Sequence, residues 1–173
     1  MPIVTRKVCL IGDFAVGKTS LVRRFVDGQF SDQYLSTVGV KLSRRNLSAS
    51  LTTGKSQELR LIIWDIEGET KFRVIAPSYL QGAKGAILVA DVSRPQTIEN
   101  LLNHQELFFS VNPTAKIAIA LNKSDLLAPA QVQDLIATTP ILDATRLLNI
   151  AHTSAKTGEQ VNRIFETLAS AIV

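Results

Sequence analysis

Short apolar runs alternate with amphipathic stretches along most of the chain. The apolar runs predict buried strands at residues 8–11, 59–64, 86–90 and 116–121, with a weak last strand at 150–152. These runs are too short to cross a membrane, so they indicate the interior strands of a globular protein.

The stretches between these runs predict a hairpin and several helices. Apolar and polar residues alternate in part over residues 40–51, and Gly54 supplies a turn before the strand at 59–64. This pattern is typical of an antiparallel hairpin. The spacing of apolar residues predicts helices at 17–26, 97–111 and 158–172, an irregular or short helix at 72–80, and a short helix that begins near Pro129.

This order of elements predicts one three-layer α/β domain over residues 1–173. Strands that alternate with helices form a mainly parallel sheet with helices on both faces, and the hairpin adds one antiparallel edge strand, which makes six strands. Ligands of such sheets bind beyond the carboxyl ends of the strands. Most of the chemically suggestive residues lie there, at 12–19, 65–68, Asp91, 122–125 and 153–156.

Composition narrows the class of protein. Of the 173 residues, 46% are apolar and 20% charged, which argues against disorder and against a fibrous protein. Cys9 is the only cysteine, so an intrachain disulfide and a cysteine-based zinc site are excluded, and we expect a small core residue there. The net charge of +4 is too weak and too dispersed to indicate nucleic-acid binding.

No targeting or lipidation signal is visible in the sequence. Pro2 excludes N-myristoylation, and the chain as given has no C-terminal cysteine for prenylation. We therefore expect a cytoplasmic protein with no encoded lipid anchor, which would reach a membrane surface only through a partner.

Residues 12–19 have the spacing and context of a phosphate-binding loop. Gly12-x4-Gly17-Lys18-Thr19 lies between a predicted strand and a predicted helix, where backbone N–H groups and the helix N-terminus attract phosphate. Lys18 would neutralise the outer phosphates, and Thr19 would offer its hydroxyl to Mg²⁺. The alternative is a chance glycine-rich turn with a capping threonine, which this context disfavours.

Further segments resemble the guanine-nucleotide motifs of the Ras superfamily, and the Rab branch most closely. Asn122-Lys-Ser-Asp125 matches the family's Asn-Lys-x-Asp, and Thr153-Ser-Ala-Lys156 matches its Ser-Ala-Lys. Residues 30–40 look like the first switch, and Trp64-Asp-x-x-Gly68 begins the second. The resemblance runs from about Lys7 to the final helix.

The resemblance implies a P-loop G-domain that binds GTP or GDP with Mg²⁺, hydrolyses GTP and changes conformation between the two states. It implies that Mg²⁺ is held by Thr19, Thr37 and Asp65. The residues that it implies for hydrolysis are Lys18, Thr37, Gly68 and Glu69. Effectors, exchange factors and GTPase-activating proteins would bind near residues 30–45 and 65–80. The nucleotide contacts that it implies are Gly12, Asp13, Phe14, Ala15, Val16, Gly17, Lys18, Thr19, Ser20, Phe30, Tyr34, Thr37, Gly68, Asn122, Lys123, Asp125, Ser154, Ala155 and Lys156.

The chemistry of Asp125 agrees with a guanine site. Its carboxylate can accept from two guanine N–H groups, a pair that adenine does not offer. By the resemblance, Asn122 braces the loops, Lys123 covers one face of the ring, and the Ala155 N–H meets the guanine O6. Phe30 would lie against the base, although a core or hinge aromatic is the alternative there.

Three residues depart from the family pattern. The family's Trp-Asp-Thr-Ala-Gly-Gln-Glu reads Trp64-Asp-Ile-Glu-Gly-Glu-Thr70 here, so Glu69 replaces the glutamine that orients water and Glu67 replaces an alanine. An ionised Glu69 cannot donate a hydrogen bond and adds negative charge near the phosphoryl group, unless it points into solvent. Glu67 would repel the γ-phosphate or pair with a lysine or arginine. Phe14 would crowd the opening for an arginine finger, or else pack under the second switch.

These departures predict a slow GTPase that favours GDP. Two other functions stay open: a GTP/GDP-binding interaction module with negligible hydrolysis, and a P-loop kinase. The motifs at 122–125 and 154–156 argue against the kinase.

The remaining polar candidates do not indicate a further site. His104 and His152 lack partners for a zinc site or a Cys–His dyad. We expect Arg23-Arg24 and Arg44-Arg45 to be solvated; the alternative is contact with a partner or an acidic membrane.

Overall fold

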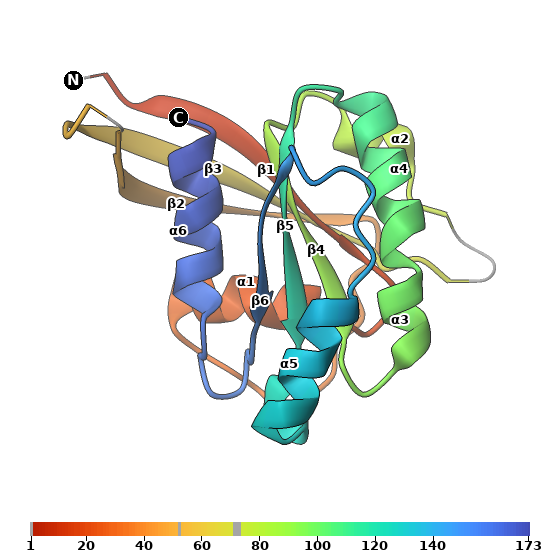
Figure 1. The fold of residues 1–173 in the computed structure, drawn as a ribbon. Coiled ribbons are helices and arrows are strands. Elements are labelled where there is room, and N and C mark those ends of the chain that lie inside the picture. Colours follow the sequence, from red (N-terminus) through yellow and green to blue (C-terminus); the bar gives the residue numbers. More distant parts are fainter. Residues whose placement is uncertain (1, 52, 71–73) are drawn as a thin grey trace.

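The computed structural model describes residues 2–51, 53–70 and 74–173, and these form one mixed sheet with helices on both faces (Figure 1). The strand order is β2-β3-β1-β4-β5-β6. Only β2 and β3 pair antiparallel, and the other neighbours are parallel, which confirms the predicted fold class. The strands are β1 (Val4–Gly12), β2 (Val40–Ser50), β3 (Ser56–Ile66), β4 (Gly85–Asp91), β5 (Lys116–Asn122) and β6 (Leu147–His152).

The burial of each strand follows its place in the sheet. Every residue of β4 is buried, because this strand lies near the middle and is covered on both faces. The edge strand β2 instead has half-buried residues alternating with exposed ones over most of its length. The second half of β1 is fully buried, which brings the chain to the carboxyl edge of the sheet at Gly12.

The helices divide into two layers with separate apolar cores. The helices α1 (Lys18–Asp27) and α6 (Val161–Ala171) cover one face, where the rings of Phe25 and Phe165 stack with centroids 4.1 Å apart. Residues of the other helices pack against the second core on the opposite face. These helices are α2 (Pro77–Leu80), α3 (Pro95–Glu99), α4 (Leu101–Val111) and α5 (Pro129–Thr138).

The structure differs from the sequence-based elements at several helix ends. The helix predicted at 97–111 is divided into α3 and α4 at Asn100, whose side chain donates to Asp13 rather than pointing into solvent. The last helix begins at Val161 rather than at 158, because Gly158 and Gln160 have positive φ angles that are incompatible with a helix. Part of the segment predicted at 72–80, residues 72 and 73, lies outside the described residues.

Two of the four arginines expected to be solvated are packed instead, so that expectation is wrong for them. The guanidinium of Arg45 donates to the Phe25 carbonyl and lies 4.6 Å from the centroid of the Phe25 ring. Arg24 donates from Nε to the Ala155 carbonyl at 2.8 Å and from Nη2 to the Lys156 carbonyl at 2.6 Å. Both side chains are held by carbonyl oxygens that a solvated arginine would leave to water.

Cys9 is a buried core residue, as predicted. It has no exposed surface, and burial raises the pKa of its thiol to about 12. Such a thiol is uncharged near neutral pH and therefore a poor nucleophile.

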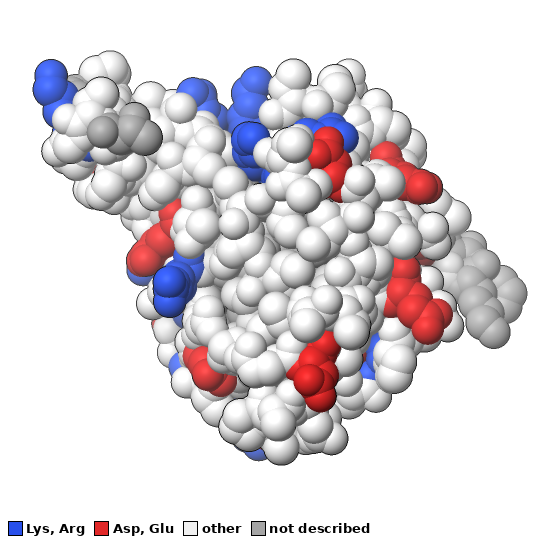
Figure 2. Space-filling model, viewed as in Figure 1, with Lys and Arg blue, Asp and Glu red and all other residues white. Residues whose placement is uncertain are grey.

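Charges of both signs are spread over the face that Figure 2 shows. Basic side chains lie mainly along its upper margin and acidic ones mainly along its right and lower margins, and the middle of the face is largely uncharged. Among the helices that the structure describes, none has the length and apolar character required to cross a membrane.

Candidate functional site

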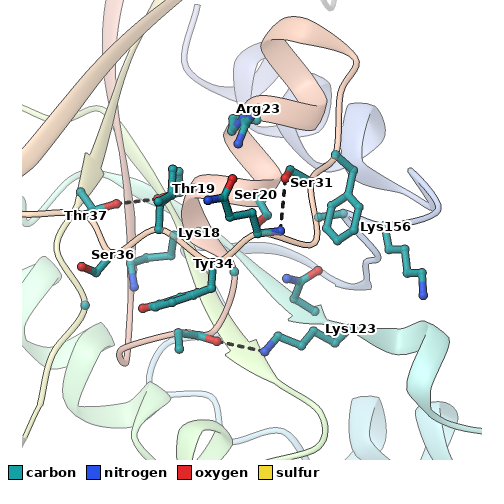
Figure 3. A pocket seen from close by; sticks show the side chains of 18 of the residues that line it. Lys18, Thr19, Ser20, Arg23, Ser31, Tyr34, Ser36, Thr37, Lys123 and Lys156 are labelled. Atoms are coloured by element: carbon teal, nitrogen blue, oxygen red, sulfur yellow. Dashed lines mark hydrogen bonds between the residues drawn. The ribbon is translucent and has the colours of Figure 1, made fainter.

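A cavity of about 630 Å³ opens at the carboxyl edge of the sheet (Figure 3). Most residues of the segments 14–20, 29–38 and 122–126 line it, together with residues from the end of β3, the segment after it and the loop after β6. Most of the predicted nucleotide residues therefore face one cavity. Four others, Gly12, Asp13, Val16 and Ser154, are not among its lining residues.

The loop between β1 and α1 is folded around the amine of Lys18. Lys18 is buried, and its Nζ donates to the carbonyls of Gly12 at 3.1 Å and Asp13 at 2.9 Å. Desolvation lowers the pKa of this amine to about 8, although the charges of Asp65 and Asp13 oppose the shift. Burial makes the charged form of this amine less stable, so any anion that enters the cavity stabilises it.

Gly17 is required by the geometry of this loop. Its φ of +99° lies in the left-handed region, and a Cβ there would come within 2.3 Å of Asn122 Nδ2. Asn122 fills this space in order to brace two loops: its Nδ2 donates to the Val16 carbonyl at 3.0 Å, and its Oδ1 accepts from Thr153 at 3.2 Å.

The three residues predicted to hold Mg²⁺ meet at one point. The Oγ1 atoms of Thr19 and Thr37 are 2.6 Å apart (Figure 3). Thr19 Oγ1 also donates to Asp65 Oδ2 at 2.5 Å. Asp65 is buried, and its Oδ1 has no hydrogen-bond partner within the described ranges. Burial raises the pKa of Asp65, while the Thr19 hydroxyl and Lys18 oppose this. A buried carboxylate with a free oxygen beside two hydroxyls fits a hard divalent cation such as Mg²⁺.

Asp125 lies at the opposite end of the cavity, where a second set of contacts positions it. Its Oδ1 accepts from Ser154 Oγ at 2.7 Å, which leaves Oδ2 to a ligand. Lys123 donates to the Ala15 carbonyl at 3.0 Å and forms an ion pair with Asp91 at 2.7 Å, so its stem crosses this end of the cavity. Phe30 lines the cavity and also packs against the core below α1 and α6.

The two aromatic residues Phe14 and Tyr34 meet at the mouth of the cavity. Their ring centroids are 5.7 Å apart in an edge-on arrangement, and Phe14 remains 41% exposed. Arg94 donates from Nη2 to the Phe14 carbonyl at 2.7 Å and so fixes the loop from outside. Phe14 therefore contacts the first switch segment.

Glu67 and Glu69 lie in different surroundings. Glu67 Oε2 accepts from the Gly39 N–H at 2.9 Å, and the Glu67 N–H donates to the Gly39 carbonyl at 2.8 Å, so this residue joins the two switch segments. The backbone of Glu69 pairs with the phosphate loop, accepting from the Phe14 N–H at 2.9 Å. Its carboxylate lies 3.5 Å from His104 Nδ1 on α4.

Gly68 allows the second switch segment to approach the phosphate loop closely. A Cβ at this position would lie 2.5 Å from the Phe14 Cα and 2.7 Å from the Phe14 nitrogen. Any side chain at position 68 would therefore push the two segments apart.

Sequence reasoning missed three residues that support the site: Arg94, Asn100 and His104. Arg94 and Asn100 contact Phe14 and Asp13 through side chains, and contacts so distant in the sequence leave no local pattern. His104 had a usable signal. It lies three residues after Leu101 and four before Phe108, both of them buried, so helical spacing places it on the apolar face of α4.

Comparison with known proteins agrees with this arrangement. The model of the Ras family matches residues 7–173 of the chain. Ras-related protein SEC4 of Candida albicans is 33% identical over 174 residues, which cover 96% of this chain and 76% of that protein. Ras-related protein RABA2d of Arabidopsis thaliana is 35% identical over 167 residues (96% and 74%), and Ras-related protein Rab-5A of Dictyostelium discoideum is 37% identical over 164 residues (94% and 78%).

The sheet order and the loop after β1 define the class as a P-loop G-domain. With a family match over nearly its whole length, the chain belongs to the Ras family, and the relatives named above are of the Rab type that its motifs predict.

Proposed function

We propose that residues 1–173 form one G-domain that binds GTP or GDP with Mg²⁺, hydrolyses GTP slowly and switches conformation between the two states. The observation that carries this proposal is the contact of the Thr19 hydroxyl with both Thr37 and Asp65. It joins the phosphate loop to both switch segments at one point, where loss of the γ-phosphate would release Thr37.

The charged groups of the cavity have complementary roles in this proposal. Lys18 holds the outer phosphates, and because its amine is already buried, little of the cost of desolvation falls on binding. Mg²⁺, when bound, neutralises charge on the phosphate oxygens, and Thr19, Thr37 and Asp65 would hold it. The Gly68 N–H would donate to the γ-phosphate, and Asp125 with the loop at 154–156 would select guanine.

Slow hydrolysis follows from the position of Glu69. Its carboxylate faces α4 rather than the cavity, and an ionised carboxylate is a poor substitute for an amide that must both accept and donate. The same observation favours a second candidate, a GTP/GDP-binding interaction module with negligible hydrolysis. Single-turnover hydrolysis by the purified protein decides between the two.

In this proposal the partner proteins and the cellular location are those expected of a member of the Ras family. Several large apolar side chains of the switch segments are exposed, among them Tyr34, Leu35, Val38 and Val74. Exposed apolar side chains are common at protein interfaces, so effectors and regulators would dock over residues 30–45 and 65–80. We place the protein in the cytoplasm, or at a membrane surface through such a partner.

The nucleotide that accompanies the purified protein tests the proposal at little cost. Mass spectrometry of the denatured protein should detect GDP or GTP in amounts close to that of the chain. An adenine nucleotide in the same amount would favour the kinase alternative.

Replacing Thr19 with asparagine should lower GTP affinity about tenfold more than GDP affinity. The change removes the hydroxyl that meets Thr37 and Asp65, and only the GTP state is expected to use Thr37. Thr19→Ser is the matched control, since it keeps the hydroxyl and should keep the affinity ratio. The measurement is the GTP-to-GDP affinity ratio with and without Mg²⁺, and an unchanged ratio in Thr19→Asn would contradict the role.

Replacing Glu69 with glutamine should raise the single-turnover rate of GTP hydrolysis about tenfold. A glutamine can donate as well as accept, and it removes a negative charge from the segment next to the γ-phosphate. Glu159→Gln, at an exposed position beside His152, is the control and should leave the rate unchanged. A rate that stays at the wild-type value would show that Phe14 or another group limits access of water.

A further inference from the structure

Glu67 joins the two switch segments at the point where the pairing of β2 with β3 ends. The last regular pair is Val40 with Ile66, so Gly39 and Glu67 come next. The Glu67 N–H donates to the Gly39 carbonyl at 2.8 Å, as in a regular antiparallel ladder. The reverse hydrogen bond differs, because the Gly39 N–H donates to the side-chain Oε2 of Glu67 at 2.9 Å. The carboxylate of Glu67 therefore takes the place of a backbone acceptor.

The backbone after Glu67 leaves β2 and turns to the phosphate loop. The Glu69 N–H donates to the Gly12 carbonyl at 3.2 Å, and the Glu69 carbonyl accepts from the Phe14 N–H at 2.9 Å. Gly68 lies between these contacts and is buried. From position 68 onward the backbone is thus committed to the phosphate loop, and the side chain of Glu67 maintains the link to the first switch.

The first switch segment has few other attachments. Residues 34–39 form neither helix nor strand, and all of them except Thr37 and Gly39 are exposed. Within residues 2–51, 53–70 and 74–173, the hydrogen bonds that join 34–39 to the rest of the chain are those of Thr37 with Thr19 and of Gly39 with Glu67. Gly39 is thus the second hydrogen-bonded attachment of this segment, beside Thr37 itself.

The position of Gly39 is closely coupled to that of Thr37. Two residues of chain span at most about 7 Å, so the Gly39 backbone limits where Thr37 can lie. Gly39 also has a φ of +70°, in the left-handed region, and the chain turns there from the first switch into β2. A contact that fixes the Gly39 N–H therefore fixes the direction in which the segment approaches Thr37.

The side chain of Glu67 does not face the candidate nucleotide cavity. Ile66 and Gly68, its two neighbours in the sequence, line that cavity, whereas Glu67 is not among the lining residues. Its Oε2 is directed to the first switch instead. This placement argues against direct repulsion between Glu67 and a γ-phosphate.

We propose that Glu67 is a positioning residue for Thr37: its carboxylate holds the Gly39 N–H and so keeps the Thr37 hydroxyl beside Thr19, where Mg²⁺ would be held. This inference rests on the proposed function. By it, Glu67 favours the GTP state, because the first switch is already ordered for the contact that only this state is expected to use.

Replacing Glu67 with alanine should lower the GTP-to-GDP affinity ratio about fivefold in the presence of Mg²⁺. Without the carboxylate, the nucleotide must itself order the segment that carries Thr37, and a hydrogen bond to a charged acceptor is strong enough for an effect of this size. Without Mg²⁺ the ratio should not change, since Thr37 is expected to act through the metal. A ratio that rises in Glu67→Ala would indicate repulsion of the γ-phosphate and overturn the inference.

Two matched variants separate the hydrogen bond from charge and from general stability of the sheet. Glu67→Gln removes the charge but keeps an oxygen that can accept from the Gly39 N–H, so its ratio should stay close to that of wild type. Glu58→Ala is the control, because the Glu58 carboxylate also joins β3 to β2, by accepting from the Ser48 hydroxyl near the other end of these strands. It should leave the ratio unchanged. A fall in Glu67→Gln as large as in Glu67→Ala would contradict the role of the acceptor.

A double variant tests whether Glu67 acts through Thr37. Thr37→Ala alone should lower the ratio in Mg²⁺, and addition of Glu67→Ala should lower it no further. If Glu67→Ala lowers the ratio equally with threonine or alanine at position 37, Glu67 acts through another group and the inference is overturned.

NMR of the protein as purified separates failure of this inference from failure of the proposed function. Gly17 and Gly39 are the two glycines that follow a valine, so labelling with carbonyl-¹³C valine and ¹⁵N glycine selects their amides. Glu67→Ala should shift the Gly39 signal and speed its hydrogen exchange at least tenfold, while the Gly17 signal stays in place. An unchanged Gly39 signal would overturn the inference and leave nucleotide binding standing. A shifted Gly39 signal in a protein that binds no guanine nucleotide would instead overturn the proposed function.

Discussion

Replacing Lys18 with alanine should weaken binding of both GDP and GTP by about 100-fold. The amine is buried among carbonyl oxygens at the floor of the cavity, where a charge-assisted contact with phosphate is worth about 3 kcal/mol. That energy corresponds to an increase of about 100-fold in the dissociation constant. Equilibrium titration with a fluorescent guanine nucleotide in the presence of Mg²⁺ measures the change.

The stability of the same variant separates loss of binding from loss of folding. Desolvation disfavours the charged amine of Lys18 in the absence of phosphate, so the nucleotide-free variant should unfold at a temperature no lower than wild type. Lys116→Ala is the matched control, because that lysine also donates to a carbonyl, the one of Thr145, at the far end of β5. Full affinity in Lys18→Ala would remove Lys18 from the phosphate site.

Replacing Asp125 with asparagine should weaken GDP binding by about 100- to 1,000-fold and favour xanthine nucleotides instead. The carboxylate can accept from two guanine N–H groups, and two lost charge-assisted hydrogen bonds amount to roughly 3–4 kcal/mol. An asparagine amide can donate to the 2-oxo group of xanthine, so affinity for xanthosine diphosphate should rise. Competition of the two diphosphates for the same labelled probe measures both changes.

Two further variants locate this effect in the side chain of Asp125. Ser154→Ala removes the hydroxyl that holds Asp125 Oδ1 and should cost about fivefold in affinity without loss of guanine preference. Asp134→Asn, on the exposed side of α5, should change neither quantity. Wild-type guanine affinity in Asp125→Asn would show that the base lies elsewhere.

The sequence predicts the centre of each strand better than its ends. The apolar run at 59–64 marks the middle of β3, but the strand begins at Ser56 because the polar residues there pair through their backbone with β2, as in Ser56 with Ser50. Backbone pairing needs no apolar side chain, so periodicity does not detect it. The same holds for β6, where residues before 150 pair with β5.

Within the candidate site, local motifs predict the residues that follow strands but not the contacts that orient them. Gly12 to Thr19 is recognisable because its function depends on spacing within one loop. The partner of Glu67, the N–H of Gly39, lies 28 positions away, and neither residue type suggests the other. Sequence reasoning offered solvent, the γ-phosphate or a basic side chain as the surroundings of these glutamates, and did not include a backbone amide for Glu67 or His104 for Glu69.

The central claim is that the cavity selects a guanine nucleotide, and competition binding tests it most directly. A fluorescent GDP bound to the wild-type protein with Mg²⁺ should be displaced by micromolar or lower GDP and GTP, but not by ATP at 100 times those concentrations. Displacement by ATP at the same concentration as GTP would contradict guanine selection through Asp125.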